Sequence, residues 1–374
     1  MASSHLSYAE NIYLNYDPEQ ALPKNRMITA ADRAAAGLPD PIPWPADYTP
    51  TPVPLSPAPA DTDSLARFVG YDAVVMTYTA AEAASLATLF TPENLVSTWY
   101  NNRHNKDAYV PLVTGSKSPF ATSPHDSRYY QSLGLYFPCT IGKAKVLLIK
   151  SGLHMDYDGI APDGTTIAFY KMVAEVVGIV RPKIFITTGT GGGIGDKVKL
   201  GDIIIATKTR FDCTSQFASQ PWHSQSYSTS TLPPGTIDLI QPGLTVINGQ
   251  HIASATPIPG NSVPKIWHSS SNIVTTDKFA FDTSYDDFKL QGLGDVCDMG
   301  DAMVGRALAS YPQVLWYAIR NASDPQIPMK ADTKEDLEQA DKEAGEIYQK
   351  YGGYTTAASV IATWAIIAAL AQRL

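Results

Sequence analysis

The stretch ITTGTGGGIGDKVKLGDIIIATKT, residues 186–209, decides the fold of this 374-residue chain. It begins as an apolar strand, places five glycines within residues 189–195, and then enters a second apolar run. Glycine loses more backbone entropy on folding than any other residue, so such a cluster has a structural reason. We expect a glycine-rich loop that brings the backbone close to a small ligand at the end of a strand.

The glycine-rich stretch lacks the features of the two common nucleotide-phosphate motifs. Gly195 is followed by Asp196, not by the Lys-Ser/Thr pair of a P-loop. A dinucleotide fingerprint that begins at Gly189 requires a third glycine at position 194, which is Ile194. That fingerprint also opens a helix, whereas this stretch leads into a further strand at 201–209. The ligand is therefore not a nucleotide pyrophosphate.

Strands and helices alternate on both sides of this stretch. Apolar runs predict strands at 71–78, 133–152 (two strands that turn around Gly142), 181–189, 201–209, 272–277, 294–300 and 313–324. Three-to-four spacing predicts helices at 79–90, 164–180 and 301–311, and two helical segments near the C-terminus. This alternation predicts a three-layer αβα fold with a central mixed, largely parallel sheet.

The N-terminal part differs in composition. Nine prolines lie between Pro39 and Pro59, and proline lacks an amide donor, so this segment is neither a helix nor an interior strand. It is either an extended tether or a strap on the surface. We expect residues 1–66 to form a proline-rich N-terminal extension and residues 67–374 to form the catalytic domain.

Composition limits the partners. A formal charge of −8 argues against nucleic acid and an anionic membrane surface. Three cysteines without CxxC spacing, and seven histidines without paired ligand spacing, predict no metal site, no cofactor and a reducing compartment, hence the cytoplasm.

The C-terminal run YTTAASVIATWAIIAALAQ, residues 354–372, contains no charge and is nearly long enough to span a bilayer. Four hydroxyl residues interrupt it, and the chain has no companion span. A buried helix of a globular domain is therefore the favoured interpretation over a membrane span.

Four segments resemble the nucleoside phosphorylase / nucleosidase superfamily, whose members cleave the N-glycosidic bond of nucleosides. The glycine-rich stretch resembles the family's loop, and VVMTYTAAEAASLATLF (74–90) resembles the first strand and helix of its methylthioadenosine / S-adenosylhomocysteine nucleosidase branch. DVCDMGDAMVGRAL (295–308) and LWYAIRNASD (315–324) resemble the Met segment at the ribose and the terminal Ser-Asp segment. The resemblance covers about residues 70–374, with insertions near 92–133 and 212–270.

The resemblance implies two catalytic carboxyl groups. Asp324, beside Ser323, would protonate the leaving base at the purine N7, which needs a pKa raised by burial. The alternative is that the Ser-Asp-Pro sequence only forms a turn. Glu82 would activate water as a general base. The alternative is a solvated glutamate in the first helical turn, favoured by the helix dipole.

The residues available for phosphate favour hydrolysis over phosphorolysis. The phosphorylase branch carries arginines after its first strand and before the glycine loop. Here the first strand is followed by TYTAAE, without arginine, and Thr187 stands before the loop. A phosphate dianion would lack the charge-assisted bonds that normally hold it.

The resemblance also places substrate-binding residues. The loop backbone at Thr190, Gly191 and Gly192 would approach the sugar and base. Phe279 would stack on the base, with core packing as its alternative, and Met299 would lie against the ribose.

The segment departs from the family at Gly300, where relatives place a glutamate that grips the ribose hydroxyls. Asp301, one position later, would either take over that grip or cap the helix that it begins.

Together these features predict a homo-oligomeric enzyme that hydrolyses the N-glycosidic bond of a purine nucleoside or a related nucleoside and releases free base and sugar. One alternative is phosphorolytic cleavage. The other is a nucleoside-binding protein without catalysis, suggested by the missing glutamate at Gly300.

Overall fold

The computed structural model describes residue 42 and residues 44–113, 132–155, 167–195, 197–253, 264–277, 289–324 and 333–371. Its strands are β1 (Thr51–Pro52), β2 (Ala73–Thr77), β3 (Tyr100–Asn102), β4 (Gly134–Ile141), β5 (Ala144–Ser151), β6 (Ile184–Gly193), β7 (Ile203–Ile205), β8 (Lys208–Asp212), β9 (Ser226–Ser228), β10 (Ile266–Trp267), β11 (Asn272–Thr276), β12 (Val296–Asp298) and β13 (Leu315–Asp324). Its α-helices are α3 (Ala80–Phe90), α4 (Ala168–Val180), α5 (Thr236–Ala253), α6 (Asp301–Leu308) and α7 (Lys334–Ala371).

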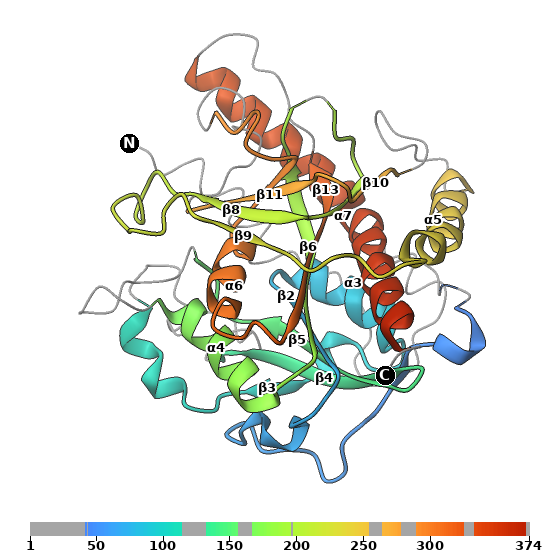
Figure 1. Ribbon diagram of the computed structural model, residues 1–374. Coiled ribbons are helices and arrows are strands. Elements are labelled where there is room, and N and C mark those ends of the chain that lie inside the picture. Colours follow the sequence, from blue (N-terminus) through green and yellow to red (C-terminus); the bar gives the residue numbers. More distant parts are fainter. Residues whose placement is uncertain are drawn as a thin grey trace.

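β6 is the axis of the sheet (Figure 1). Its first half lies between two parallel neighbours, since Ile184 pairs with Ala73 of β2 and with Leu315 of β13. The pairing with β2 ends at Thr187, and β12 joins the same strand in antiparallel orientation at Gly192. Between these two points no described strand pairs with that edge of β6, so its backbone groups need other partners.

The sheet is mixed, with its parallel pairs at the centre. Its order is β1-β4-β5-β2-β6-β12-β11-β8-β9, and β13 leads from β6 through β7 to β10. The neighbours β5, β2, β6 and β13 are parallel, as are β12, β11 and β8, whereas β1, β3, β4 and β9 pair antiparallel at the margins.

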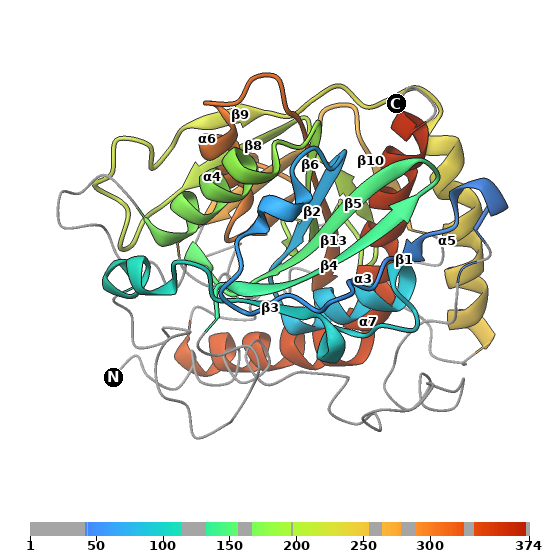
Figure 2. The same cartoon turned by 90° about the horizontal axis from the view of Figure 1, so that it is seen from below.

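Helices cover both faces of this sheet. α4 and α6 lie on one side, and α3, α5 and α7 lie on the other (Figures 1 and 2). Residues of β6 alternate between the two cores: Phe185 packs with α4 and α6, whereas Ile184 and Ile186 pack with α3 and α7. The predicted three-layer αβα fold is confirmed.

The glycine-rich stretch differs from its prediction. Most of it is strand and not loop, because β6 continues to Gly193 and pairs with β13 as far as Gly192. The single strand expected at 201–209 is instead two short strands. β7 pairs with β13, and β8 pairs with β11, so the chain changes neighbour between Ile205 and Lys208. Apolar periodicity does not report such a change of partner.

The uncharged C-terminal run is a buried helix, as predicted. Thr355, Thr356, Ser359 and Thr363 are all buried, and the Ser359 and Thr363 hydroxyls donate to helix carbonyls three and four residues earlier. The two C-terminal segments expected from sequence are one continuous helix, α7. Among the described helices, none combines the length and the hydropathy that crossing a membrane requires.

The described part of the proline-rich segment lies against the domain. β1 pairs antiparallel with the edge strand β4, where Pro52 stands opposite Cys139. Trp44 packs on Trp364 of α7 with ring centroids 4.6 Å apart, and the Trp364 indole donates to the Tyr48 carbonyl at 2.7 Å. Residues 44–52 therefore run along the surface like a strap.

Candidate active site

Four ionisable side chains meet at the carboxyl ends of β2, β6 and β13, and we call them the Arg320 cluster. They are Glu82 in the first turn of α3, Asp298 at the end of β12, Asp301 at the start of α6, and Arg320 in β13. All four are buried. The carboxyl ends of parallel strands are where open α/β sheets bind ligands.

Arg320 connects the three carboxylates. Its Nε donates to Asp301 Oδ2 at 2.8 Å, and its Nη2 donates to Asp301 Oδ1 at 2.6 Å. Nη2 also lies 3.1 Å from Asp298 Oδ2, and Nη1 lies 3.5 Å from Glu82 Oε1. A buried carboxylate is costly without a positively charged partner, and the guanidinium supplies one to all three carboxylates.

Glu82 accepts five hydrogen bonds. Oε2 accepts from the Thr77 hydroxyl and from the amides of Tyr78 and Thr79, all at 2.8–2.9 Å. Oε1 accepts from the amide and the hydroxyl of Thr190, at 2.7 and 2.8 Å. Burial alone would raise the pKa of Glu82, but Arg320 and the backbone donors outweigh it and lower that pKa. Glu82 is thus an anion at neutral pH.

Two features of sequence bring Glu82 to β6. The Thr79 hydroxyl accepts from the Glu82 amide while Glu82 accepts from the Thr79 amide, which is a capping box. Gly189 leaves room for the carboxylate, since a Cβ there would lie 2.3 Å from Glu82 Oε1 and 2.8 Å from Arg320 Nη1. The alternative of a solvated first-turn glutamate is wrong, because Glu82 is 2% exposed.

Glu82 and Arg320 fill the gap between β2 and β12 along β6. The Thr190 amide donates to Glu82, and the Thr190 carbonyl accepts from Arg320 Nη1 at 3.3 Å. These are the backbone groups that no described strand pairs at this edge. At Gly189 the close approach that glycine allows is therefore made by the protein's own side chains.

Asp301 is fully buried, and both of its oxygens accept from Arg320. It does not cap α6, contrary to one expectation from sequence: the N-cap is Gly300, which makes no side-chain cap bond. Asp298 serves that end of the helix instead, because its Oδ2 accepts from the amides of Gly300 and Asp301 at 3.1 and 2.8 Å.

The pKa of Asp298 is raised well above its usual range. Burial and the charge of Asp301 raise its pKa to about 7, and Arg320 and the Thr275 hydroxyl only partly offset them. Two carboxylates that share one guanidinium resist simultaneous ionisation. The cluster therefore holds a proton near neutral pH.

Asp324 ends β13, four residues beyond Arg320. It stands opposite Gly192 of β6 after an irregularity that follows Ala322. Burial raises its pKa to about 6, although the Ser323 hydroxyl, which donates to Asp324 Oδ1 at 2.6 Å, lowers it. Asp324 thus has the buried position and the raised pKa that a general acid needs.

Tyr78 occupies the space in front of Gly300. A Cβ at position 300 would lie 3.0 Å from Tyr78 Cζ and 3.2 Å from its hydroxyl. The φ of Gly300 is −158°, which any residue adopts, so space and not backbone conformation demands glycine here. The absence of a side chain at 300 and the presence of a large one at 78 are thus linked.

The structure brings most of the sequence-predicted residues together at this edge of the sheet. Thr190, Gly191, Gly192, Ser323 and Asp324 lie on β6 and β13, Glu82 lies on α3, Met299 lies between β12 and α6, and Asp301 begins α6. Phe279 lies outside the described residues. Thr187 is buried in β6.

Sequence reasoning missed Arg320 and Tyr78, and it gave Asp298 no role. A signal for Arg320 existed, because a lone arginine within the apolar strand 315–324 needs a buried partner. No local pattern pointed to Tyr78, whose link to Gly300 spans most of the domain.

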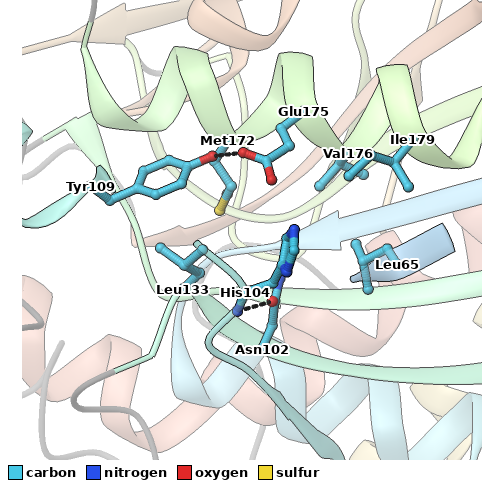
Figure 3. Close-up of a pocket in the computed structure, with 9 residues that line it drawn as sticks. All are labelled: Leu65, Asn102, His104, Tyr109, Leu133, Met172, Glu175, Val176 and Ile179. Carbon is cyan, nitrogen blue, oxygen red and sulfur yellow. Dashed lines mark hydrogen bonds between the residues drawn. The ribbon is translucent and has the colours of Figure 1, made fainter. Parts of the chain in front are cut away.

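A separate pocket lies between α4 and residues 102–113 (Figure 3). It measures about 270 Å³ with its open mouth, and its lining residues are Leu65, Asn102, His104, Tyr109, Leu133, Met172, Glu175, Val176 and Ile179. The acidic group in its wall is already engaged, because Glu175 accepts from Tyr109 and from Asn105. Because this volume includes open solvent, the enclosed space falls far short of most ligand pockets, which measure roughly 300–1,000 Å³.

One comparison with known proteins identifies a family. A family model described as "Phosphorylase superfamily" matches residues 110–351, which is more than half of the chain. No curated protein matches the sequence.

Solved structures that align with this chain include two 5′-methylthioadenosine/S-adenosylhomocysteine nucleosidases. The one from Neisseria meningitidis has a TM-score of 0.45 and 13% identity, over 80% of this chain and 99% of that chain. The one from Streptococcus pneumoniae has a TM-score of 0.47 and 15% identity, over 80% and 100%. The futalosine hydrolase of Helicobacter pylori has a TM-score of 0.45 and 12% identity, over 79% and 97%. On the strength of the family match, the chain belongs to the phosphorylase superfamily.

Proposed function

We propose that this protein hydrolyses the N-glycosidic bond of a nucleoside and releases the free base and the sugar. The observation that carries the proposal is Asp324, a buried carboxyl with a pKa of about 6, which ends the strand that carries Arg320, at the ligand-binding edge of the sheet. An acid and an excess of negative charge at the same edge of the sheet are what departure of a base from a sugar requires.

Asp324 is the proposed general acid. A purine leaves a sugar readily only after protonation, and N7 is the ring nitrogen proposed to take the proton. Because the pKa of Asp324 is about 6, a substantial fraction of the carboxyl carries a proton just below neutral pH. The Ser323 hydroxyl would stabilise the carboxylate that remains after the transfer.

The Arg320 cluster is the proposed counter-charge. Three carboxylates face one guanidinium, so the cluster stays net negative even when Asp298 holds a proton. Negative charge fixed in a buried site stabilises an oxocarbenium-like sugar without reorganisation. Glu82, kept ionised by its five donors, is the proposed base for water, and an electrophilic sugar needs only a weak base.

The contacts that occupy the Arg320 guanidinium favour hydrolysis over phosphorolysis. Among the described residues it is the cation in contact with the cluster, and its donors point at Asp301, Asp298 and Thr190. A phosphate dianion would have to displace these carboxylates.

The non-catalytic alternative also has an observation in its favour. Glu82 and Asp301 have their oxygens engaged by protein donors, as expected of groups that hold a binding site in shape.

A nucleoside panel separates these functions. The full-length protein is incubated with purine and pyrimidine nucleosides, with and without phosphate, and free base and sugar products are resolved by chromatography. Hydrolysis predicts free base and free sugar at a rate independent of phosphate. A sugar 1-phosphate product would establish phosphorolysis, and binding without any product would establish the non-catalytic role.

The finer predictions of a purine base, a cytoplasmic location and a homo-oligomer belong to the same proposal. The panel tests the base, sedimentation of the purified chain tests the oligomer, and fractionation of expressing cells tests the location.

A further inference from the structure

The first observation concerns the direction in which a side chain at position 300 would point. A Cβ built on Gly300 would contact Tyr78 at Cζ, the hydroxyl and Cε2, at 3.0–3.3 Å. The tyrosine ring therefore fills the space next to Met299 that a longer residue at position 300 would enter.

Tyr78 is held in that space from several sides. Its ring meets Phe169 and His154 edge to face, with centroids 5.5 and 5.8 Å apart. The Arg320 guanidinium lies 4.8 Å from the ring centroid, and the Tyr78 hydroxyl donates to Asp301 Oδ1 at 3.4 Å. A ring fixed in this way does not step aside to admit a polar group.

The second observation concerns the carboxylates around the ring. Glu82 accepts five hydrogen bonds, and both oxygens of Asp301 accept from Arg320. Asp298 accepts from Thr275 through Oδ1 and from two amides through Oδ2, which also faces Arg320. Every carboxylate oxygen of the Arg320 cluster thus has a protein donor.

Among the described residues, a sugar bound here would find an aromatic ring and carboxylates whose oxygens already accept from protein donors. Each hydroxyl that leaves water without gaining an acceptor weakens binding. We propose that the protein takes 2′-deoxyribonucleosides in preference to ribonucleosides, and that Tyr78 determines this specificity by filling the space before Gly300. This inference rests on the proposed function for the nature of the ligand.

The test measures binding separately from chemistry, because 2′-deoxy sugars also lose their base more readily without an enzyme. Dissociation constants are measured for matched pairs, such as 2′-deoxyadenosine with adenosine and 2′-deoxyguanosine with guanosine, on the Asp324→Asn variant. We expect the deoxy member to bind more tightly by about tenfold to a hundredfold, the range in which an apolar site rejects an added hydroxyl.

Two variants assign the preference to the ring. Tyr78→Phe keeps the ring and removes its hydroxyl, so the preference should persist. The double variant Tyr78→Gly with Gly300→Glu removes the ring and supplies a new carboxylate, so the preference should reverse toward the riboside. Tyr109→Phe, which removes a buried phenol hydroxyl elsewhere, is the control and should leave the ratio unchanged. Circular dichroism checks the fold, and the Tyr78→Phe result holds even where the double variant does not fold.

Equal or tighter binding of the riboside, or binding of neither member, would overturn the inference. Cleavage of ribosides by the wild-type protein with no deoxy preference in binding would leave the proposed function standing and remove this specificity. A deoxy preference in binding without cleavage by the wild-type protein would do the opposite.

Discussion

Asp301 and Arg320 form a bidentate ion pair, in which Nε and Nη2 reach the two carboxylate oxygens at 2.8 and 2.6 Å. Both side chains are essentially inaccessible to solvent. The pair fixes the guanidinium so that its remaining donors reach Asp298 and β6. A single arginine thereby joins α6, β12, β6 and α3 at the edge where the site lies.

Replacement of Arg320 should be among the most destabilising changes in the chain. Arg320→Met leaves buried carboxylates without a counter-charge, and breaking a buried pair in this way costs about 3–5 kcal/mol. Chemical denaturation measures the loss. The deficit should shrink as the pH falls, because protonation relieves the unpaired carboxylates.

Arg320→Lys is the matched control, since it retains the charge but loses the bidentate geometry. It should be intermediate in stability. A stable Arg320→Met variant with an unchanged pH profile would show that the cluster does not depend on this guanidinium.

The raised pKa of Asp324 predicts how turnover depends on pH. Its protonated form is the active one, so kcat should fall as the pH rises through about 6. Ser323→Ala removes a hydrogen bond that favours the charged carboxylate, so the pKa should rise and this limb should move to higher pH.

Asp324→Asn keeps the shape but cannot donate a proton, so turnover should fall roughly 10²–10⁴-fold while substrate binding persists. Initial rates from pH 4 to 9, together with calorimetric binding, check both points. Near wild-type turnover in the Asn variant would remove Asp324 from the mechanism.

Glu82→Gln should reduce both activity and stability. The amide nitrogen of Gln can only donate, yet each Glu82 oxygen faces donors, so at least one buried donor loses its acceptor at a cost of about 1–3 kcal/mol. Thermal unfolding should register this loss. Release of free sugar should be abolished, and added phosphate should not restore it.

A Glu82→Gln protein with full thermal stability would contradict the hydrogen-bond arrangement. A protein that is destabilised yet fully active would instead contradict the role of Glu82 as the base.

Gly189→Ala should displace Glu82. The new Cβ would stand 2.3 Å from Glu82 Oε1, so the carboxylate or β6 must move. We expect a loss of stability of about 1–3 kcal/mol, as overpacking of a filled site causes, and a loss of activity.

Gly178→Ala in α4 is the control for this substitution. Its Cβ would meet only the Tyr311 hydroxyl, at an ordinary 3.5 Å, and alanine favours a helix by about 1 kcal/mol over glycine. The control should be neutral or stabilising. Equal effects of the two substitutions would show that the space at Gly189 is not critical.

Much of the fold was predictable because its signals are local. The apolar runs that became β2, β4, β5, β11, β12 and β13 lie within their predicted ranges, and Gly142 turns the β4–β5 hairpin with a φ of +58°. The capping box of α3 was half visible, since Thr79 was expected as the cap and Glu82 stands three residues later. Each of these signals involves residues within a few positions of one another.

Only the tertiary structure revealed three features: the extent of β6, the split of 201–209 into β7 and β8, and the environment of the site. Glycines form a strand at 191–193 because β13 and β12 supply hydrogen-bond partners from more than 100 residues away. The sequence alone determined which residues carry the carboxyl groups proposed to act at the site, namely Glu82 and Asp324. The protonation states of Glu82 and Asp324 depend on burial and on neighbouring groups, and the need for glycine at position 300 depends on the space that Tyr78 fills. Only the tertiary structure decides these properties, because only folding brings the side chains concerned into contact.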